Sequence, residues 1–110
     1  MEPEKNLLMK DGCHIEPSGD KSWWKDGKLH REDGAAIEWE NGTKFYYKND
    51  KMHRENAPAI ECAGGGYCYY VNDIKHRTDG PALDFGDGRI FYYLHGKELT
   101  REEFLFEIMK

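Results

Sequence analysis

An aromatic pair recurs along this chain at a fixed interval of 23 residues, at Trp23-Trp24, Tyr46-Tyr47, Tyr69-Tyr70 and Tyr92-Tyr93. Four further columns keep the same step without any insertion: a His-Arg pair, a glycine, a large aliphatic residue and an acidic residue. Their members are His30-Arg31, His53-Arg54 and His76-Arg77; Gly42, Gly65 and Gly88; Ile37, Ile60 and Leu83; and Glu38, Glu61 and Asp84. A period of this length indicates a repeat architecture, in which each unit packs on its neighbours.

Each repeat is predicted to contain two short strands and two turns. Residues 36–39 alternate small or acidic residues with large apolar ones, the pattern of a half-buried strand. Residues 44–48 form the second strand, and Glu40-Asn41-Gly42 joins the two, because a three-residue hairpin loop needs a left-handed residue last. The second turn falls at pairs that tolerate positive φ, namely Asp26-Gly27, Asn49-Asp50, Asn72-Asp73 and His95-Gly96.

The hairpin loop fixes a register in which Trp39 faces Thr43, Glu38 faces Lys44 and Ile37 faces Phe45. A slip of one residue would bring Lys44 into the apolar face, so this register is preferred. The opposite face then carries Glu38, Lys44 and Tyr46. We expect the core at four columns: Ile37, Ile60 and Leu83; Trp39, Cys62 and Phe85; Phe45, Cys68 and Phe91; and Trp24, Tyr47, Tyr70 and Tyr93.

The two ends of the chain depart from the repeat. Residues 1–10 are predicted to be an N-terminal segment that frays and then docks. Residues 11–22 are interpreted as a degraded half-repeat, in which Asp11-Gly12 and Ile15-Glu16 correspond to Asp33-Gly34 and Ile37-Glu38 with one turn residue missing.

At the C-terminus, Thr100-Arg101-Glu102-Glu103 matches a capping box, and an apolar helical spacing follows at Phe104, Leu105, Ile108 and Met109. An unpaired edge strand invites aggregation, so we expect this helix to cover the open end of the array. The sequence therefore predicts one all-β domain over residues 1–110. It consists of an antiparallel, open meander sheet of hairpins over 11–98 and a short capping helix over 100–110.

Composition excludes several classes of function. Of 110 residues, 38% are hydrophobic, and the net charge of −5 argues against a non-specific grip on nucleic acid. No apolar run approaches membrane-spanning length, and the first residues lack a signal-peptide pattern. Three cysteines (Cys13, Cys62 and Cys68) fit reduced thiols, so we expect a cytoplasmic protein. Zinc-site spacing, a nucleophile elbow and a phosphate loop are all missing from the sequence, which indicates no metal, no cofactor and no enzyme.

Residues 69–82 read Tyr-Tyr-Val-Asn-Asp-Ile-Lys-His-Arg-Thr-Asp-Gly-Pro-Ala. Over roughly residues 11–98 this pattern resembles the membrane occupation and recognition nexus (MORN) repeat. It is most similar to the variant Tyr-Tyr-x-Asn-Gly-Lys-x-His-Arg-x-Asp-Gly-Pro-Ala of short phage and large-virus proteins. Arg31, Arg54 and Arg77 replace the glycine of the better-studied repeats, while Asn56-Ala57 replaces Asp-Gly in one copy and Ala35 replaces Pro in another. The resemblance implies an elongated sheet of hairpins and a non-enzymatic binding role.

Three columns have both a functional and a structural interpretation. The His-Arg pairs can form a cationic ladder for phosphates or carboxylates, or they can pair with acidic neighbours and backbone carbonyls to build each repeat; their repetition favours the structural role. The outer aromatic residues offer either an interaction surface or a second small core under the His-Arg loops. The acidic column is either a stripe for a basic partner or a solvated face.

The leading hypothesis is a non-catalytic protein that binds and inhibits a protein partner. The resemblance suggests a phage-encoded antagonist, in the host cytoplasm, of a host or defence enzyme of CRISPR or another anti-phage type. Its partner-binding residues would be Trp23, Tyr46, Tyr69, Tyr92, Glu38, Glu61 and Asp84. The alternative is binding of an anionic small ligand, nucleotide or lipid headgroup through His30, Arg31, His53, Arg54, His76 and Arg77. The sequence leaves the oligomeric state open, a homodimer included.

Overall fold

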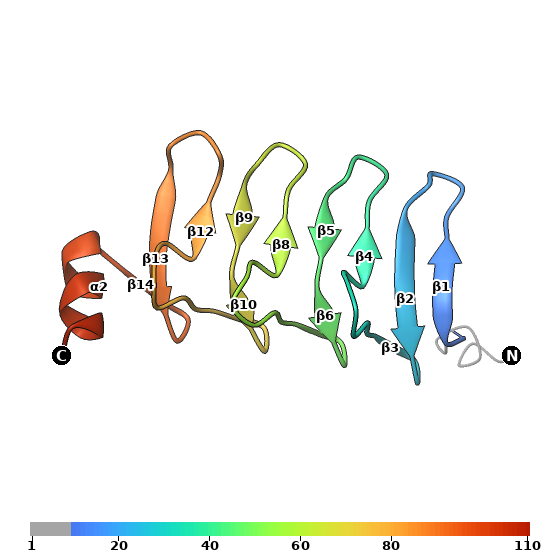
Figure 1. Cartoon of the computed structure of the whole chain (residues 1–110), viewed down its shortest axis with the longest axis horizontal. Coiled ribbons are helices and arrows are strands. Elements are labelled where there is room, and N and C mark those ends of the chain that lie inside the picture. Colours follow the sequence, from blue (N-terminus) through green and yellow to red (C-terminus); the bar gives the residue numbers. More distant parts are fainter. Residues whose placement is uncertain (1–9) are drawn as a thin grey trace, which may run out of the picture.

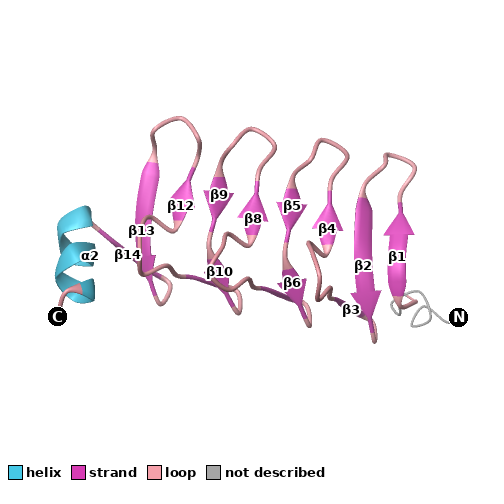
Figure 2. Ribbon diagram, viewed as in Figure 1, coloured by secondary structure: helices cyan, strands magenta, loops and turns pink. Residues whose placement is uncertain are grey.

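The computed structural model describes residues 10–110 and shows a row of antiparallel β-hairpins that ends in one short helix (Figures 1 and 2). The Cα positions extend over 54 × 26 × 25 Å, so the array is about twice as long as it is wide. The all-β class, the open antiparallel sheet and the C-terminal helix predicted from the sequence are confirmed. The predicted N-terminal segment lies outside the described residues, apart from Lys10.

Four hairpins form the main row. They are β1 (Gly12–Ile15) with β2 (Lys21–Lys25), β4 (Ile37–Glu38) with β5 (Lys44–Phe45), β8 (Ile60–Glu61) with β9 (Tyr67–Cys68), and β12 (Leu83–Asp84) with β13 (Ile90–Leu94). Further short strands form a second row of tight hairpins: β3 (Lys28–Leu29) on β2, β7 (Lys51–Met52) on β6 (Tyr47–Lys48), β11 (Ile74–Lys75) on β10 (Tyr70–Val71), and β14 (Lys97–Leu99) on β13.

The hairpin register agrees with the sequence prediction. Ile37 pairs with Phe45 and Glu38 with Lys44, and the Trp39 amide donates to the Thr43 carbonyl at 2.8 Å. Consecutive repeats also pair with each other, because β5 lies antiparallel to β8 and β9 to β12. The same pairings recur at each step, so the copies form one continuous meander.

Both turn types adopt the backbone that their residues predicted. Gly42 ends its hairpin loop at φ 98°, in the left-handed region that glycine occupies without steric cost. Asn49 and Asp50 both have positive φ, 51° and 67°, which is the backbone of a tight type I′ turn. The Asp50 side chain accepts from the Leu29 amide at 2.7 Å, and its own amide donates to the Leu29 carbonyl at 2.9 Å. This turn therefore also joins its repeat to the preceding one.

The strand predicted over 44–48 divides in the structure into β5 and β6, on either side of Tyr46. The Tyr46 amide donates to the Ala59 carbonyl of the next repeat at 2.7 Å, and its carbonyl accepts from the His53 amide at 3.0 Å. Tyr46 is therefore the point at which the chain passes from the main row to the second row. In β2 and β13 the corresponding strand is continuous.

The predicted alignment of the first half-repeat is wrong by one residue. The Gly19 amide donates to the Glu16 carbonyl, just as the Gly42 amide donates to the Trp39 carbonyl in the next hairpin. The loop therefore lacks no turn residue, and Ile15, which pairs with Lys21, takes the place of Glu38 rather than that of Ile37. A shift of one position moves a side chain to the other face of a strand, and Ile15 is accordingly 67% exposed.

The most deeply buried positions are small residues that lie between adjacent repeats. Ala36, Ala59 and Ala82 each have 0% exposure, and their carbonyls accept from the amides of the outer aromatic residues at 2.7–2.8 Å. The predicted core is wrong at three positions, since Trp39 is 46% exposed, Phe85 is 49% exposed and Cys62 is also exposed. Cys68 is buried. The other two members of its column and all four aromatic residues of the last column are half-buried: Phe45, Phe91, Trp24, Tyr47, Tyr70 and Tyr93.

The helix α2 (Arg101–Ile108) begins with the predicted capping box. The Thr100 hydroxyl accepts from the Glu103 amide at 3.1 Å, and the Glu103 carboxylate accepts from the Thr100 amide at 2.8 Å. Phe104 is 2% exposed and packs on the Tyr92 ring, with 4.8 Å between ring centroids. Phe104 therefore fastens the helix to the last hairpin, whereas Ile108 and Met109 remain exposed.

Candidate interaction surfaces

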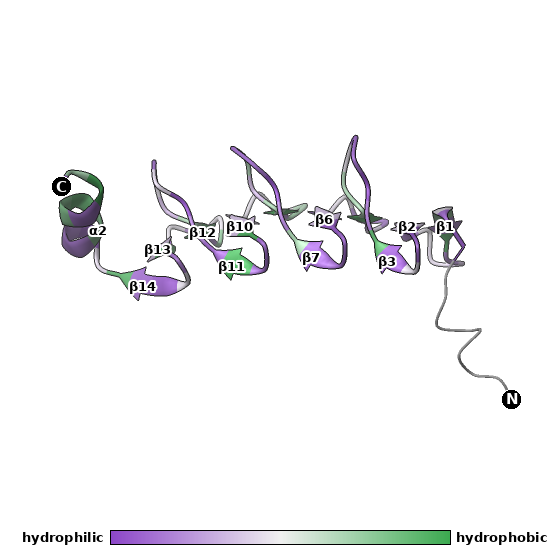
Figure 3. Ribbon diagram, turned by 90° about the horizontal axis from the view of Figure 1, so that it is seen from below, coloured by the Kyte–Doolittle hydropathy of each residue, from purple (hydrophilic) through white to green (hydrophobic). Residues whose placement is uncertain are grey.

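The array has two unlike faces. Figure 3 shows the hairpins of β3, β7 and β11 on one side of the row, and the segments that lead from them to β4, β8 and β12 rising on the other side. These connecting segments carry the His-Arg pairs and are called here the His-Arg loops: residues 30–35, 53–58 and 76–81. The side that they cover is the loop face, and the opposite side of the main row is the open face.

The histidines of the loops hold the neighbouring turns. The Nδ1 atoms of His30, His53 and His76 accept from the backbone amides of Asn49, Asn72 and His95 at 3.0, 3.1 and 2.9 Å. Each acceptor nitrogen must be unprotonated, so the three histidines are fixed in the tautomer with the proton on Nε2. This contact repeats at the same place in every unit and joins one repeat to the next.

The arginines of the loops cover the outer aromatic column. Arg31 lies over Trp23 and Arg54 over Tyr46, each with 3.8 Å between the guanidinium carbon and the ring centroid, and Arg77 lies over Tyr69 at 4.1 Å. Guanidinium groups stack on aromatic faces because the ring quadrupole attracts a cation. Tyr92, which has no such loop, is covered by Phe104. The outer aromatic column thus packs inside the chain as a second small core and is half-buried.

The same arginines also neutralise two members of the acidic column. Arg31 Nη1 lies 3.3 Å from Glu38 Oε2, and Arg54 Nη1 lies 3.0 Å from Glu61 Oε2. The carboxylate of Asp84 accepts from the Gly86 amide at 2.7 Å instead. Six of the seven residues predicted to contact a partner therefore already contact other side chains of the chain on the loop face. The four aromatic residues do so through their rings, and Glu38 and Glu61 do so through their carboxylates. The seventh, Asp84, makes its contact within its own hairpin.

The open face presents apolar side chains in an aromatic, cysteine, aromatic order. Trp39 packs on Phe45 at one end, with 4.8 Å between centroids, and Phe85 packs on Phe91 at the other, with 5.8 Å. The equivalent positions of the middle repeat hold two cysteines. Since Trp39 and Phe85 are about half exposed, residues 10–110 leave this part of the face uncovered.

The two small cysteines border a hollow of about 210 Å³ between the middle hairpin and Phe85 of the next one, here called the notch. Its lining includes Ile60, Cys62, Cys68, Leu83 and Phe85. Burial raises the pKa of the Cys68 thiol, so this cysteine stays protonated and behaves as a core residue rather than as a nucleophile. The sequence predicted these side chains to share one face but placed them in the core. Cys62 and Phe85 are exposed because residues 10–110 place no second layer over them, which no pattern within one repeat reveals.

Other chemistry finds little support in the described part of the chain. Between residues 10 and 110, no three His, Cys, Asp or Glu side chains are grouped so that they could hold a metal ion. No described helix is long and apolar enough to cross a membrane. Comparison of the chain with protein-family models, with curated proteins and with solved structures gives no match.

Proposed function

We propose that this chain is a non-catalytic binding protein whose open face engages a protein partner. The observation that carries the proposal is the exposure of Trp39 and Phe85 on the open face, where Phe85 also lines the notch. An apolar sheet face normally packs against another layer, and exposed aromatic residues are the side chains that contribute most to protein interfaces. The loop face fits this role less well, because its aromatic rings are half-buried beneath arginine side chains, whereas Phe85 stays 49% exposed even with Arg89 over its ring.

The shape of the open face favours a partner that differs from the chain itself. In a two-fold dimer centred on the middle repeat, the Trp39 pair of one copy would meet the Phe85 pair of the other, and notch would face notch. Such an interface would bring the aromatic pairs of the two copies against each other and leave a void at its centre. A partner that inserts one apolar side chain at Cys62 fills the notch and buries both aromatic pairs, as interface cores require.

The class of partner is proposed from charge and from the sequence resemblance. The net charge of −5 suits a partner with a basic surface around its apolar contact. The likeness of residues 69–82 to the MORN-like repeats of short phage and large-virus proteins supports a host protein as the partner. We therefore propose that the chain acts in a host cell as an inhibitor of a defence enzyme, of CRISPR or another anti-phage type.

The test uses three variants of the tagged chain and a bacterial lysate. The double variant Trp39→Ser, Phe85→Ser removes the exposed aromatic side chains of the open face. The variant Cys62→Trp fills the notch and at the same time adds apolar surface. Ile15→Ser is the matched control, because Ile15 is more exposed than either aromatic residue but has its side chain on the loop face. Thermal unfolding of each variant confirms that the fold is retained.

The wild type and Ile15→Ser are expected to retain the same host protein, and the other two variants are expected to lose it. Retention by Cys62→Trp would show that binding follows apolar area alone and would remove the notch from the proposal. Equal retention by all variants would remove the open face altogether. The retained protein is then purified, and its enzymatic activity is measured with and without the chain to test inhibition.

A further inference from the structure

The three His-Arg loops are built alike, yet the middle one differs at the residues that contact its arginine. In the first and third loops the arginine Nε donates to an aspartate two residues further on, from Arg31 to Asp33 at 3.1 Å and from Arg77 to Asp79 at 2.7 Å. The middle loop has Asn56 at this position, and no hydrogen bond joins it to Arg54. The carboxylate that pairs with this edge of the guanidinium in two repeats is therefore replaced in the third.

The next residue enforces the difference. Gly34 and Gly80 lie against the guanidinium groups of their loops, since a Cβ on either would stand 2.9–3.0 Å from the Arg31 or Arg77 Cζ atom. The middle loop has Ala57 here, and a methyl group fits beside the arginine only if the backbone of the loop takes another course. Asn56 adopts a left-handed backbone at φ 65°, which neither Asp33 nor Asp79 does. The middle loop is thus folded so that its own side chain does not reach the Nε edge of Arg54.

Arg54 is nevertheless held in place. Its Nη1 donates to the Pro58 carbonyl at 3.2 Å and to Glu61 at 3.0 Å, and its guanidinium carbon lies 3.8 Å from the centroid of the Tyr46 ring. Within residues 10–110, its Nε and Nη2 groups have no hydrogen-bond partner. Its side chain is 31% exposed, compared with 24% for Arg31 and 20% for Arg77. The guanidinium of Arg54 is therefore held in place, and its edge formed by Nε and Nη2 is available to a ligand.

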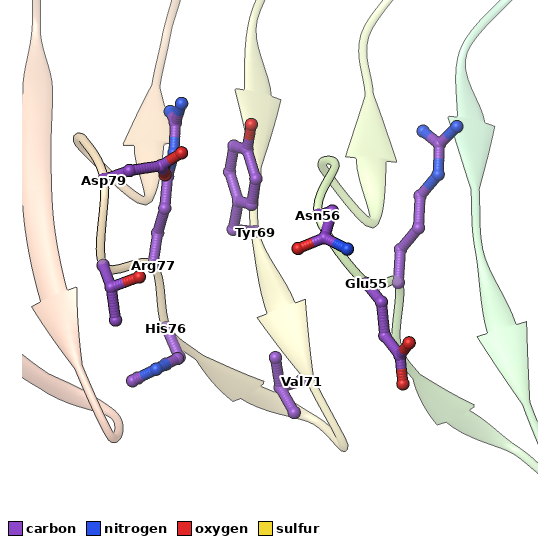
Figure 4. Close-up of a pocket in the computed structure, with 9 residues that line it drawn as sticks. Glu55, Asn56, Tyr69, Val71, His76, Arg77 and Asp79 are labelled. Carbon is purple, nitrogen blue, oxygen red and sulfur yellow. The ribbon is translucent and has the colours of Figure 1, made fainter.

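A hollow of about 360 Å³ lies beside Arg54, between the middle and third loops. Figure 4 shows Asp79 beside Arg77 on one side of Tyr69, and Asn56 and Glu55 of the middle loop on the other. The carboxylates of Glu55 and Asp79 therefore both line the hollow. They disfavour a doubly charged phosphate more than a singly charged carboxylate, because repulsion grows with the charge of the ligand.

We infer that Arg54 is a binding site for a carboxylate, supplied by an aspartate or glutamate side chain of a partner protein. The incoming group takes the place that Asp33 and Asp79 fill in the other loops, and it accepts from the Nε and Nη2 donors as a fork. The sequence predicted anion binding at all three His-Arg pairs. The proposed site is restricted to Arg54, because Arg31 and Arg77 already pair with a carboxylate of their own loops. The site lies on the loop face and does not depend on the open face.

The experiment follows the arginine Nε–H resonances of the ¹⁵N-labelled chain during titration with sodium acetate, with sodium chloride at equal ionic strength as the reference. Arg31 and Arg77 act as internal controls. Sodium phosphate at the same ionic strength distinguishes the two kinds of anion. The variant Asn56→Asp with Ala57→Gly gives the middle loop the sequence of the other two and closes the site without removing any arginine.

Acetate is expected to shift the Arg54 resonance in a saturable manner, by more than chloride does, and to leave Arg31 and Arg77 unmoved. In the variant, the Arg54 resonance is expected to move toward those of the other two arginines before any acetate is added, and the response to acetate is expected to disappear. An Arg54 shift no larger than that of Arg31 would overturn the site. A larger response to phosphate than to acetate would overturn the carboxylate assignment. Neither result bears on the open face, which the lysate experiment tests separately.

Discussion

Replacement of Phe104 by alanine should detach the C-terminal helix from the array. The eight residues of α2 are too few to form a stable helix alone, so the helix persists only because its side chains pack. Phe104 is the one residue of α2 that is buried, at 2% exposure. Its ring covers Tyr92 as the arginines cover the other outer aromatic residues.

The size of the effect follows from the buried area. A phenylalanine buries about 200 Å², which at about 25 cal/mol per Å² corresponds to about 5 kcal/mol. Residual burial in the unfolded chain reduces this by roughly 10–40%. Phe104→Ala should therefore lower the free energy of unfolding by about 3–4.5 kcal/mol, within the usual range for this substitution. A loss of this size is a large part of the stability of a small domain.

The assay is urea unfolding of the wild type, Phe104→Ala and the control Phe106→Ala. Phe106 lies on the same helix but is 68% exposed, so its removal should change the free energy of unfolding by less than about 0.5 kcal/mol. Hydrogen exchange of residues 101–108 reports whether the helix detaches before the array unfolds. Equal and small effects of the two substitutions, with unchanged exchange in α2, would refute the reasoning.

Two further predictions concern the interior and the pH dependence of stability. Ala59→Val should destabilise the chain by about 1–3 kcal/mol, because a fully buried alanine between two repeats has no room for extra methyl groups. The control Ala63→Val, at an exposed position, should not destabilise it. Equal midpoints of the two variants in thermal unfolding would contradict this prediction. Burial and the neighbouring charge of His95 lower the pKa of His76, so the folded state binds fewer protons than the unfolded state does. The stability that His76 contributes is therefore complete above about pH 6.5, the ordinary pKa of histidine, and is lost as the pH falls from there toward the pKa of the folded state. His76→Asn should flatten the decrease in unfolding midpoint between about pH 7.5 and about pH 5.5, and an unchanged slope would count against it.

Much of the local structure could be predicted because it depends on neighbours in the chain. The loop glycine at Gly42, the Asn49-Asp50 turn and the capping box at Thr100 each act over a few residues, and all three take the predicted form. The register of Ile37 against Phe45 follows from the loop length in the same way. The predicted alignment of residues 11–22 with the repeat is wrong because their sequence has diverged. The position of Gly19 in the loop sets the register, not the likeness of Ile15 to Ile37.

The amino-acid pattern alone predicts that a hairpin is copied every 23 residues, which residues turn the chain, and where a helix caps the array. Which face is covered depends on the path of the chain in space, because a period-2 pattern assigns side chains to two faces without indicating which of them another segment crosses. The His-Arg loops cross the face that carries Trp23, and Trp39 and Phe85 stay exposed on the open face. The replacement of Asp by Asn56 was visible in the sequence, but its consequence for Arg54 depends on the fold of the loop around it.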